Sequence, residues 1–395
     1  MISRRILNIE ESSTLAMAQK SRDLVKEGKK IINLSLGEPD FNTPNFIKEA
    51  AKKAIDEDFS KYTPVGGYED LREAISVKFR RDNNLIYEKN QIICSTGAKQ
   101  SLMQLLLCIL NPNDEIILPS PYWVSYFQMI KFAKAKPVIL NTSIENNFKI
   151  NAKDLEKKIT QNTKAFLINS PSNPTGAVYT ENELLEISNV IKKHPKIIVI
   201  SDEIYEHINF TNKHTSIGEF LDTKKQVVTV NGLSKGFAMT GWRLGYLGAP
   251  TEITKACIKL QGQFTSGTCS ITQRAAISAL LKKPDFTKEM KNKFLIRRDL
   301  TMDLLKNIKG IKVPEPEGAF YIFADFSYYF NKKYNQKTIN NNDELSLFLL
   351  EEGEVATVSG SAFGDNNCIR ISIASSENDL KTAISRIKKC LSKLS

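Results

Sequence analysis

The sequence has few histidines, no closely spaced cysteines and no long apolar run, and each absence excludes a class of protein. Only three histidines occur in 395 residues: His194, His207 and His214. The six cysteines form no C-x-x-C pair, which suggests free thiols in a reducing compartment. No apolar run approaches the roughly 18 residues that cross a bilayer, and the N-terminus lacks the apolar core and cleavage site of a signal peptide. We therefore expect a cytoplasmic protein without a membrane segment.

The net charge is positive, but the basic residues are spread along the chain. Lys and Arg number 55 against 44 Asp and Glu, which gives a formal net charge of +11. They lie in mixed-sign runs such as KDLEKK and KEMKNKF rather than in one basic arm, so we expect no nucleic-acid partner. The hydrophobic content of 41% is that of a globular protein, and the length allows a large core and two domains.

Short β-branched runs alternate with helix-period segments through most of the chain. The expected strands are IINLSLG, which ends at Gly37, and then QIICS, DEIILPS, KPVIL, TKAFLINS, KIIVISD and QVVTVN. The expected helices are NFIKEAAKKAIDED, YEDLREAISVKFRRDN, SLMQLLLCIL, YWVSYFQMIKFA and TENELLEISNVIKKH. This alternation predicts an α/β fold with a mostly parallel sheet that helices cover on both faces.

The pattern changes near residue 285, where a long charged helix begins. Beyond it we expect the strands GIKV, GAFYIFADF, VATVSG and CIRISIA and the helices NDELSLFLLEEG and ENDLKTAISRIKKCLSKL. These elements predict a smaller α+β domain, formed by the N- and C-terminal parts together. We place the large domain at 45–285 and the small domain at 1–44 and 286–395.

The stretch NGLSKGFAMTGWRLGYLG follows a strand and matches the nucleophile pattern G-x-S-x-G, with Ser234 at the serine position and Lys235 beside it. A hydrolase of that kind needs a histidine base later in the chain, and all three histidines precede Ser234. His207 and His214 are poorly spaced for a metal pair, with no carboxylate or cysteine cluster joining them, so we expect loop or helix-surface positions and no metal. The chemistry therefore falls to Lys235.

A lysine amine is used as a nucleophile chiefly through a Schiff base, and pyridoxal 5′-phosphate (PLP) is its commonest partner. A PLP site needs an acid for the pyridine nitrogen, donors for the ring oxygen, cations and amides for the phosphate, and an aromatic plate over the ring. For the acid, Asp202 ends a strand. For the ring oxygen, Tyr205 follows in SDEIY, and Asn173 lies in the Pro-fixed loop NSPSNPTG.

Candidates for the phosphate and the plate also follow strands. STGAKQ places Gly97, Ala98 and Lys99 at the start of a helix, where free amides and the helix dipole favour an anion. Arg243 adds a planar guanidinium suited to phosphate. Trp123 in SPYWVSY is the candidate plate. All these residues lie at or just beyond strand ends, where an open α/β sheet binds its ligands.

Seven motifs together resemble one known family. They are SLGEPDF, YTPVGG, NSPSNPTGAVY, SDEIYE, NGLSKGFAMTGWRLGY, GAFYIF and CIRIS. They are similar to the class I aminotransferases of the PLP type I fold, and most of all to the bacterial branch of aspartate aminotransferases. The resemblance covers nearly the whole chain. It implies ping-pong transfer of the amino group from aspartate to 2-oxoglutarate.

The resemblance also implies roles for individual residues. Lys235 would form the aldimine with PLP and carry the proton between Cα and C4′. Arg370 of CIRIS would bind the substrate α-carboxylate, helped by Asn173, Trp123 and the Gly37 backbone.

Two further implied roles concern the distal carboxylate and the neighbouring subunit. Lys99 would meet the distal carboxylate of the substrate. The chain would form a homodimer in which Tyr62 reaches the phosphate of the neighbouring subunit's cofactor.

Two positions depart from the family pattern. Gly232 replaces a serine that binds phosphate in many members, so the amides near Ala98, Arg243 and Ser234 would compensate. Glu10 or Glu11 stands where a lysine is linked to prephenate activity. An aminotransferase of broader specificity (aspartate/prephenate or aromatic) and a PLP lyase or synthase remain alternatives. The chain lacks the G-x-G-x-x-G of a dehydrogenase and has too few residues before SLGEPDF for the DNA-binding domain of a PLP-fold regulator.

Overall fold

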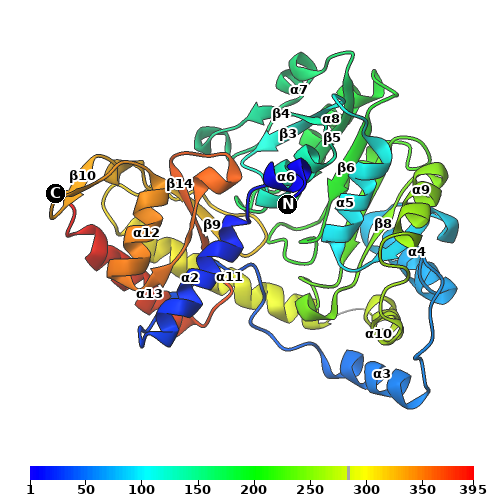
Figure 1. Cartoon of the computed structure of the whole chain (residues 1–395), viewed down its shortest axis with the longest axis horizontal. Coiled ribbons are helices and arrows are strands. Elements are labelled where there is room, and N and C mark those ends of the chain that lie inside the picture. Colours follow the sequence, from blue (N-terminus) through cyan, green and yellow to red (C-terminus); the bar gives the residue numbers. More distant parts are fainter. Residues whose placement is uncertain (283–284) are drawn as a thin grey trace.

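The computed structural model describes residues 1–282 and 285–395, and these contain a large sheet and a small sheet, each packed with helices, and two further pairs of short strands (Figure 1). Residues 283 and 284, within the predicted large domain, lie outside the described residues. The predicted domain limits, 45–285 and 1–44 with 286–395, stay a prediction.

The large sheet has seven strands in the order β2-β8-β7-β6-β5-β3-β4. Their bounds are β2 Ile92–Ser95, β3 Glu115–Ser120, β4 Lys136–Asn141, β5 Thr163–Asn169, β6 Ile198–Asp202, β7 Val227–Gly232 and β8 Gly245–Gly248. The pairs among β4, β3, β5, β6 and β7 are parallel, and β8 runs antiparallel to both of its neighbours. The predicted mostly parallel sheet is confirmed, and β8 is an additional strand that we did not expect.

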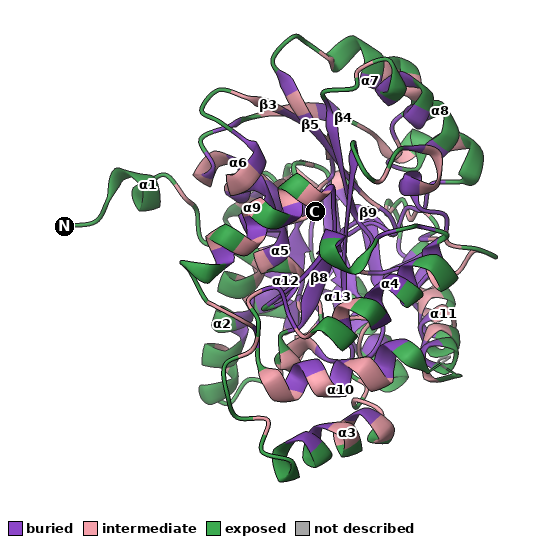
Figure 2. Cartoon of the chain, turned by 90° about the vertical axis from the view of Figure 1, so that its right-hand side faces the viewer, coloured by how far each residue is buried: buried purple, intermediate pink, exposed green. Residues whose placement is uncertain are grey.

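Helices cover both faces of this sheet, as predicted. They are α3 Asn45–Asp56, α4 Glu69–Asn83, α5 Ala98–Ile109, α6 Val124–Phe132, α7 Ala152–Lys158, α8 Glu181–Lys192, α9 Thr251–Gly262 and α10 Ser270–Leu281. Alternate residues of β5 show the two faces: Ala165 and Leu167 pack in the core with α5 and α6, whereas Phe166 and Ile168 pack in the core with α7 and α8. The strands are therefore apolar throughout, and Figure 2 shows them buried beneath half-exposed helices.

The small sheet has the order β13-β14-β9, with bounds β13 Val358–Ser359, β14 Cys368–Ser372 and β9 Tyr321–Asp325. Nearby lie the helices α2 Ser13–Lys26, α11 Asp285–Lys306, α12 Asn342–Gly353 and α13 Glu377–Leu391, and the hairpin β10 Lys332–Tyr334 with β11 Lys337–Ile339. Residues of α11, α12 and α13 share one apolar core with Ile322 and Ile371. The smaller α+β unit is thus built as expected, with the N-terminal α2 beside it (Figure 1).

Two expected strands are largely wrong. IINLSLG forms only β1 Ile32–Asn33, which pairs with β12 Val355–Ala356, because the backbone beyond it serves side chains instead. The carbonyl of Ser35 accepts a hydrogen bond from Arg370, and the carbonyl of Gly37 accepts one from Lys235. GIKV makes only an isolated bridge at Lys312.

No helix among the described residues combines the length and the apolar character needed to cross a membrane. The short helix α1 Arg4–Leu7 at the N-terminus has no buried residue and extends away from the rest (Figure 2). All six cysteines are free, in agreement with the sequence. The cytoplasmic location stays a prediction.

Candidate active site

One cavity of about 320 Å³ lies between the carboxyl ends of the large sheet and the small sheet. It gathers eleven of the predicted site residues, which are Gly37, Ala98, Lys99, Trp123, Asn173, Asp202, Tyr205, Ser234, Lys235, Arg243 and Arg370. Gly97 adjoins it through Arg243. Tyr62 lies elsewhere and is 98% exposed, so its predicted contact with a neighbouring subunit stays a prediction.

Lys235 lies in the turn after β7, where it projects into the cavity. Its Nζ donates to the Gly37 carbonyl and lies 6.0 Å from the centre of the Tyr205 ring and 5.8 Å from that of Phe320. Burial lowers the pKa of Lys235 to about 8. Among the nearby charges, Glu38 raises this pKa and Arg370 lowers it, so they partly cancel. A much larger share of this amine is therefore unprotonated near neutral pH than of an ordinary lysine.

Asp202 ends β6 with its carboxylate buried beneath the cavity. Tyr126 donates to its Oδ2 at 2.6 Å, and the Ile204 amide donates to Oδ1 at 3.2 Å. Burial raises the pKa of Asp202 to about 6, although these two hydrogen bonds oppose the rise. Tyr126 was not predicted; its position, one helical turn after Trp123 in SPYWVSY, could have indicated it.

A second unpredicted tyrosine lies beside Tyr205. The hydroxyls of Tyr205 and Tyr321 share a hydrogen bond at 2.9 Å, and both side chains are buried. Tyr321 begins β9 in the motif GAFYIF, so the motif indicated the element but not the contact. The pair joins the large sheet to the small one directly at the cavity.

The start of α5 is shaped to admit an anion. Gly97 precedes the helix with φ +84°, and a Cβ at Gly97 would overlap the guanidinium of Arg243. Gly245 is needed for the same reason, because its Cβ would fall on the amide nitrogen of Ala98. Nη1 of Arg243 donates to the Thr240 carbonyl at 2.7 Å, which fixes the guanidinium beside amides that have no acceptor within the helix.

Arg370 in β14 is the most buried cation of the cavity, at 1% exposure. Its Nη1 donates to Asn173 Oδ1 at 2.9 Å and its Nη2 to the Ser35 carbonyl at 2.6 Å. The guanidinium lies 4.4 Å from the centre of the Tyr321 ring and 4.9 Å from that of Phe363. Burial lowers its pKa, and no carboxylate of residues 1–282 or 285–395 pairs with it. Such a guanidinium is suited to an anionic ligand.

Lys99 lies at the exposed mouth of the cavity. Its Nζ is 4.9 Å from the centre of the Trp123 ring, and throughout the described chain no acidic group forms an ion pair with it. Partial loss of water and the neighbouring charge of Arg243 both lower its pKa. Lys99 and Arg370 thus form two unpaired cationic positions in one cavity.

The packing around Gly232 accounts for the missing serine. A Cβ there would lie 3.0 Å from both Gly245 Cα and the Leu244 carbonyl oxygen, so a side chain would force β7 and β8 apart. Ser234 is buried and lines the cavity. Whether it compensates in phosphate binding stays a prediction.

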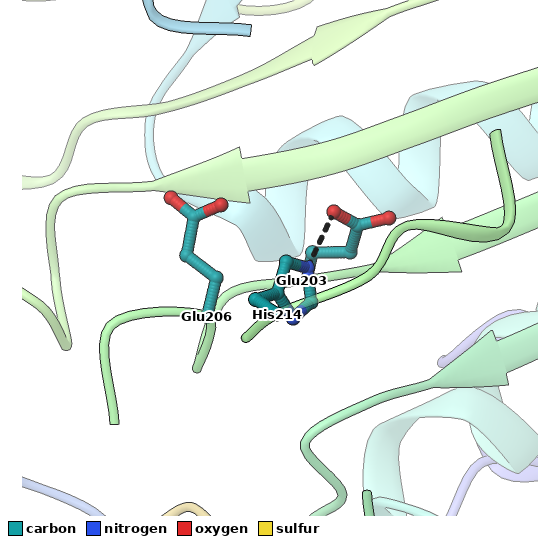
Figure 3. Close-up of side chains that lie close together, drawn as sticks. All are labelled: Glu203, Glu206 and His214. Carbon is teal, nitrogen blue, oxygen red and sulfur yellow. Dashed lines mark hydrogen bonds and ion pairs between the residues drawn. The ribbon is translucent and has the colours of Figure 1, made fainter. Parts of the chain in front are cut away.

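His207 and His214 lie in a turn and a loop, in agreement with the expectation, but the expectation that no carboxylate cluster joins them is wrong. His214 Nε2 lies 3.0 Å from Glu203 (Figure 3), and His207 Nε2 lies 3.2 Å from Glu206. Glu206 and His207 are neighbours in the sequence, whereas His214 follows Glu203 by 11 residues and meets it only in the fold. Glu203, Glu206 and His214 are close enough to share a metal ion, but Lys78 pairs with Glu206.

A second, apolar cavity of about 550 Å³ adjoins the first. The faces of α5, α6 and α9 line it together with residues 9–13, which include Glu10 and Glu11. Among the predicted site residues it contains none, so it does not compete with the first cavity as the active site.

With this geometry in place, comparison with known proteins identifies the family. A model described as aminotransferase class I and II matches residues 29–387. The chain belongs to this aminotransferase family. Its matched part contains every predicted cavity residue, and class I members of the family are PLP-dependent.

Individual members of the family are similar over almost the full chain. The bifunctional aspartate aminotransferase and glutamate/aspartate-prephenate aminotransferase of Petunia hybrida is 45% identical, over 99% of this chain and 82% of the relative. A probable aspartate/prephenate aminotransferase of Rickettsia felis is 45% identical, over 100% of this chain and 97% of the relative.

Solved structures of aminotransferases agree with the fold. The aspartate aminotransferase of Rhizobium meliloti has a TM-score of 0.96 at 40% identity, with both chains fully covered. The Thermus thermophilus enzyme with maleate has a TM-score of 0.93 at 37% identity, with 99% of each chain covered.

Proposed function

We propose that the chain is an aspartate aminotransferase that moves the amino group of L-aspartate to 2-oxoglutarate, giving oxaloacetate and L-glutamate. The observation that carries this proposal is one cavity with a buried amine, Lys235, and, besides Arg243 at the start of α5, two cations without acidic partners in the described chain, Arg370 and Lys99. A dicarboxylic amino acid offers two carboxylates to these cations and an α-proton to the amine. The names of the relatives and the maleate in the Thermus thermophilus structure support a dicarboxylate.

The residues of the cavity fit PLP. Asp202 would face the pyridine nitrogen, and its raised pKa makes it ready to share a proton there. Tyr205 and Asn173 would donate to the ring oxygen. When bound, PLP supplies an electron sink for the charge that develops at the substrate Cα.

The phosphate and the ring plane have their own candidates. The amides at Gly97, Ala98 and Lys99, the guanidinium of Arg243 and the hydroxyl of Ser234 would hold the phosphate. The indole of Trp123, at the mouth of the cavity, would cover the ring.

Lys235 performs the proton work in this proposal. Its Nζ would accept the proton from the substrate Cα, because its lowered pKa of about 8 leaves a larger share of this amine unprotonated than of an ordinary lysine. Arg370 and Asn173 orient the α-carboxylate, so that the Cα–H bond points at this amine.

Aspartate is favoured over prephenate by the acidic side chain of Glu10. Glu10 lines the apolar cavity that adjoins the active site, and it contacts Gln128. A carboxylate there repels a bulkier dicarboxylic substrate that extends in this direction.

The active unit in this proposal is a homodimer. Tyr62 has no role within its own cavity and is almost fully exposed. Phe264 is 74% exposed at the apolar cavity formed by α5, α6 and α9. Such a surface suits a second copy of the chain.

A product balance tests the reaction. The PLP-loaded protein should form oxaloacetate and glutamate in equal amounts from aspartate and 2-oxoglutarate, and Lys235→Ala should abolish both. Repeated turnover of aspartate without 2-oxoglutarate, beyond one oxaloacetate per bound PLP, would instead identify a lyase.

A further inference from the structure

A buried polar cluster lies behind the segment that carries Asp202 and Tyr205. Asp202 and Tyr205 line the active-site cavity, whereas Glu203 and Glu206 point away from it, toward the end of α4. The exposed fractions of Glu203 and Glu206 are only 1% and 7%. Residues 202–206 therefore face the cavity with Asp202 and Tyr205, and face the end of α4 with Glu203 and Glu206.

Glu203 is held by four groups. The hydroxyls of Ser201 and Ser216 donate to its Oε1 at 2.8 and 2.5 Å. On its Oε2, Asn83 Nδ2 donates at 3.0 Å and His214 Nε2 lies at 3.0 Å (Figure 3). No rotation of this carboxylate is possible without losing several of these contacts.

Asn83, the last residue of α4, connects the two carboxylates. Its Nδ2 donates to Glu203 and also to Glu206, at 2.7 Å in the second case. Its Oδ1 accepts from Lys78 Nζ at 2.6 Å, and Lys78 in turn forms an ion pair with Glu206. One amide therefore links α4 to both glutamates.

These charges are expensive to bury. The Lys78 and Glu206 side chains are 2% and 4% exposed, and a buried ion pair contributes little stability compared with apolar residues of similar volume. Burial would raise the pKa of Glu206, but Lys78, His207 and His214 lower it to about 2, so it stays ionised. What such a pair provides is a fixed geometry, because each charge must keep its partner.

The same residues do not favour a metal ion. The ammonium group of Lys78 already neutralises Glu206, and the second glutamate is saturated by hydrogen-bond donors. A divalent cation would have to displace that ammonium group from Glu206. The cluster is therefore a support for the segment in front of it.

We propose that Asn83 and Lys78 are positioning residues of the active site: through Glu203 and Glu206 they fix the segment from which Asp202 and Tyr205 reach the cofactor. This inference rests on the proposed function. The pairing of β6 with β7 fixes Asp202 and the amide of Glu203, but residues 204–207 form turns, so this pairing does not extend to Tyr205. Loss of the link would leave Arg370 and Lys99 in place and misdirect Asp202 and Tyr205.

The variant Asn83→Leu tests the proposal, because leucine has a similar size and cannot bridge the glutamates. We expect the dissociation constant for PLP, measured by equilibrium dialysis, to rise roughly 10- to 100-fold. We expect kcat with aspartate and 2-oxoglutarate to fall by a similar factor, while KM for aspartate changes less than about threefold. The pH titration of the bound cofactor's visible absorption should also shift, because Asp202 moves relative to the ring.

A matched control separates positioning from stability. Ser76 lies on the same helix and donates at 2.6 Å to the Tyr87 carbonyl, away from the cluster. Ser76→Ala should lower the unfolding temperature without changing the dissociation constant for PLP. Arg80→Met is the charge control for Lys78→Met, because Arg80 is exposed on α4. Of these two, only Lys78→Met should weaken PLP binding.

Asn83→Leu with unchanged PLP affinity and kcat would overturn the proposal. So would loss of folding in the milder variant Asn83→Ser, because the link would then serve the fold as a whole. Failure of the proposed function is recognised separately: the unsubstituted protein itself would then bind no PLP or transfer no amino group.

Discussion

The carboxylate of Asp202 is buried, and the hydrogen bonds from Tyr126 and Ile204 only partly offset the cost of its charge. Its pKa rises from 3.8 to about 6, which corresponds to a cost of up to roughly 3 kcal/mol for the ionised form at neutral pH. Asp202→Asn should therefore raise the stability of the cofactor-free protein at pH 7.5 by roughly 1–3 kcal/mol. Urea unfolding of both proteins measures this difference.

The pH dependence of this difference has a defined sign. Because the folded-state pKa is the higher one, the favourable contribution of Asp202 is complete below pH 3.8 and is lost as the pH rises through about 6. The advantage of Asp202→Asn should thus be present at pH 7.5 and absent near pH 4. An equal advantage at both pH values would mean that the carboxylate is not strained by burial.

Lys99 should select dicarboxylic substrates. It has no acidic partner in the described part of the chain and lies at the cavity mouth, so an aspartate or glutamate side chain is its natural counterion. Because it is exposed, we expect Lys99→Ala to lower kcat/KM for aspartate by roughly 10- to 100-fold. Alanine and phenylalanine should change far less. Equal losses for all four amino acids would assign Lys99 to the phosphate instead.

For individual residues, the sequence predicted which polar side chains follow the strands, but not which side chains they contact. Asp202, Asn173 and Lys235 were found because polar residues at sheet ends gather on one edge. Tyr126 and Tyr321 were missed because a tyrosine in an apolar segment gives no sign of which hydroxyl it will meet. The contact between His214 and Glu203 was also missed, since Glu203 reaches His214 only through the folded turn.

Among the elements, the start of α5 places the strictest requirement on a single residue, because position 97 must be glycine. Gly97 has φ +84°, and a side chain there would meet the Arg243 guanidinium, so Gly97→Ala adds both strain and a clash. We expect the affinity for PLP to fall by roughly 10-fold or more, because the amides and Arg243 must move apart. Gly241→Ala is the matched control, since a Cβ there meets nothing within 4 Å. Unchanged affinity in Gly97→Ala would place the phosphate elsewhere.

Most elements were predicted because their apolar patterns are strong. The strands β3, β5 and β6 are buried on both faces and read as continuous β-branched runs. The unexpected strand β8 is short and begins and ends in glycine, so it carries little strand signal. IINLSLG shows the opposite error: its pattern is that of a strand, but its carbonyls bind Arg370 and Lys235.

For the whole molecule, the open question is whether each active site uses two chains. Tyr62 is 98% exposed and does not line its own cavity, which is the expected condition of a residue that serves a second subunit. Tyr62→Ala should then weaken PLP binding by roughly 10- to 100-fold, the value of a hydrogen bond to a charged group. A homodimer allows a stronger test, because a second chain with an intact Tyr62 can restore the cavity of a chain that carries Tyr62→Ala.

The repair experiment mixes Tyr62→Ala chains with Lys235→Ala chains after both are unfolded and refolded together. In a mixed dimer, one cavity combines the intact Lys235 of one chain with the intact Tyr62 of the other, and the second cavity lacks both. Random pairing of equal amounts makes mixed dimers about half of the total, so about a quarter of all cavities should be intact. Activity should return to roughly that fraction of the unsubstituted protein's value. If each cavity used only its own chain, mixing would restore nothing beyond the sum of the two separate variants.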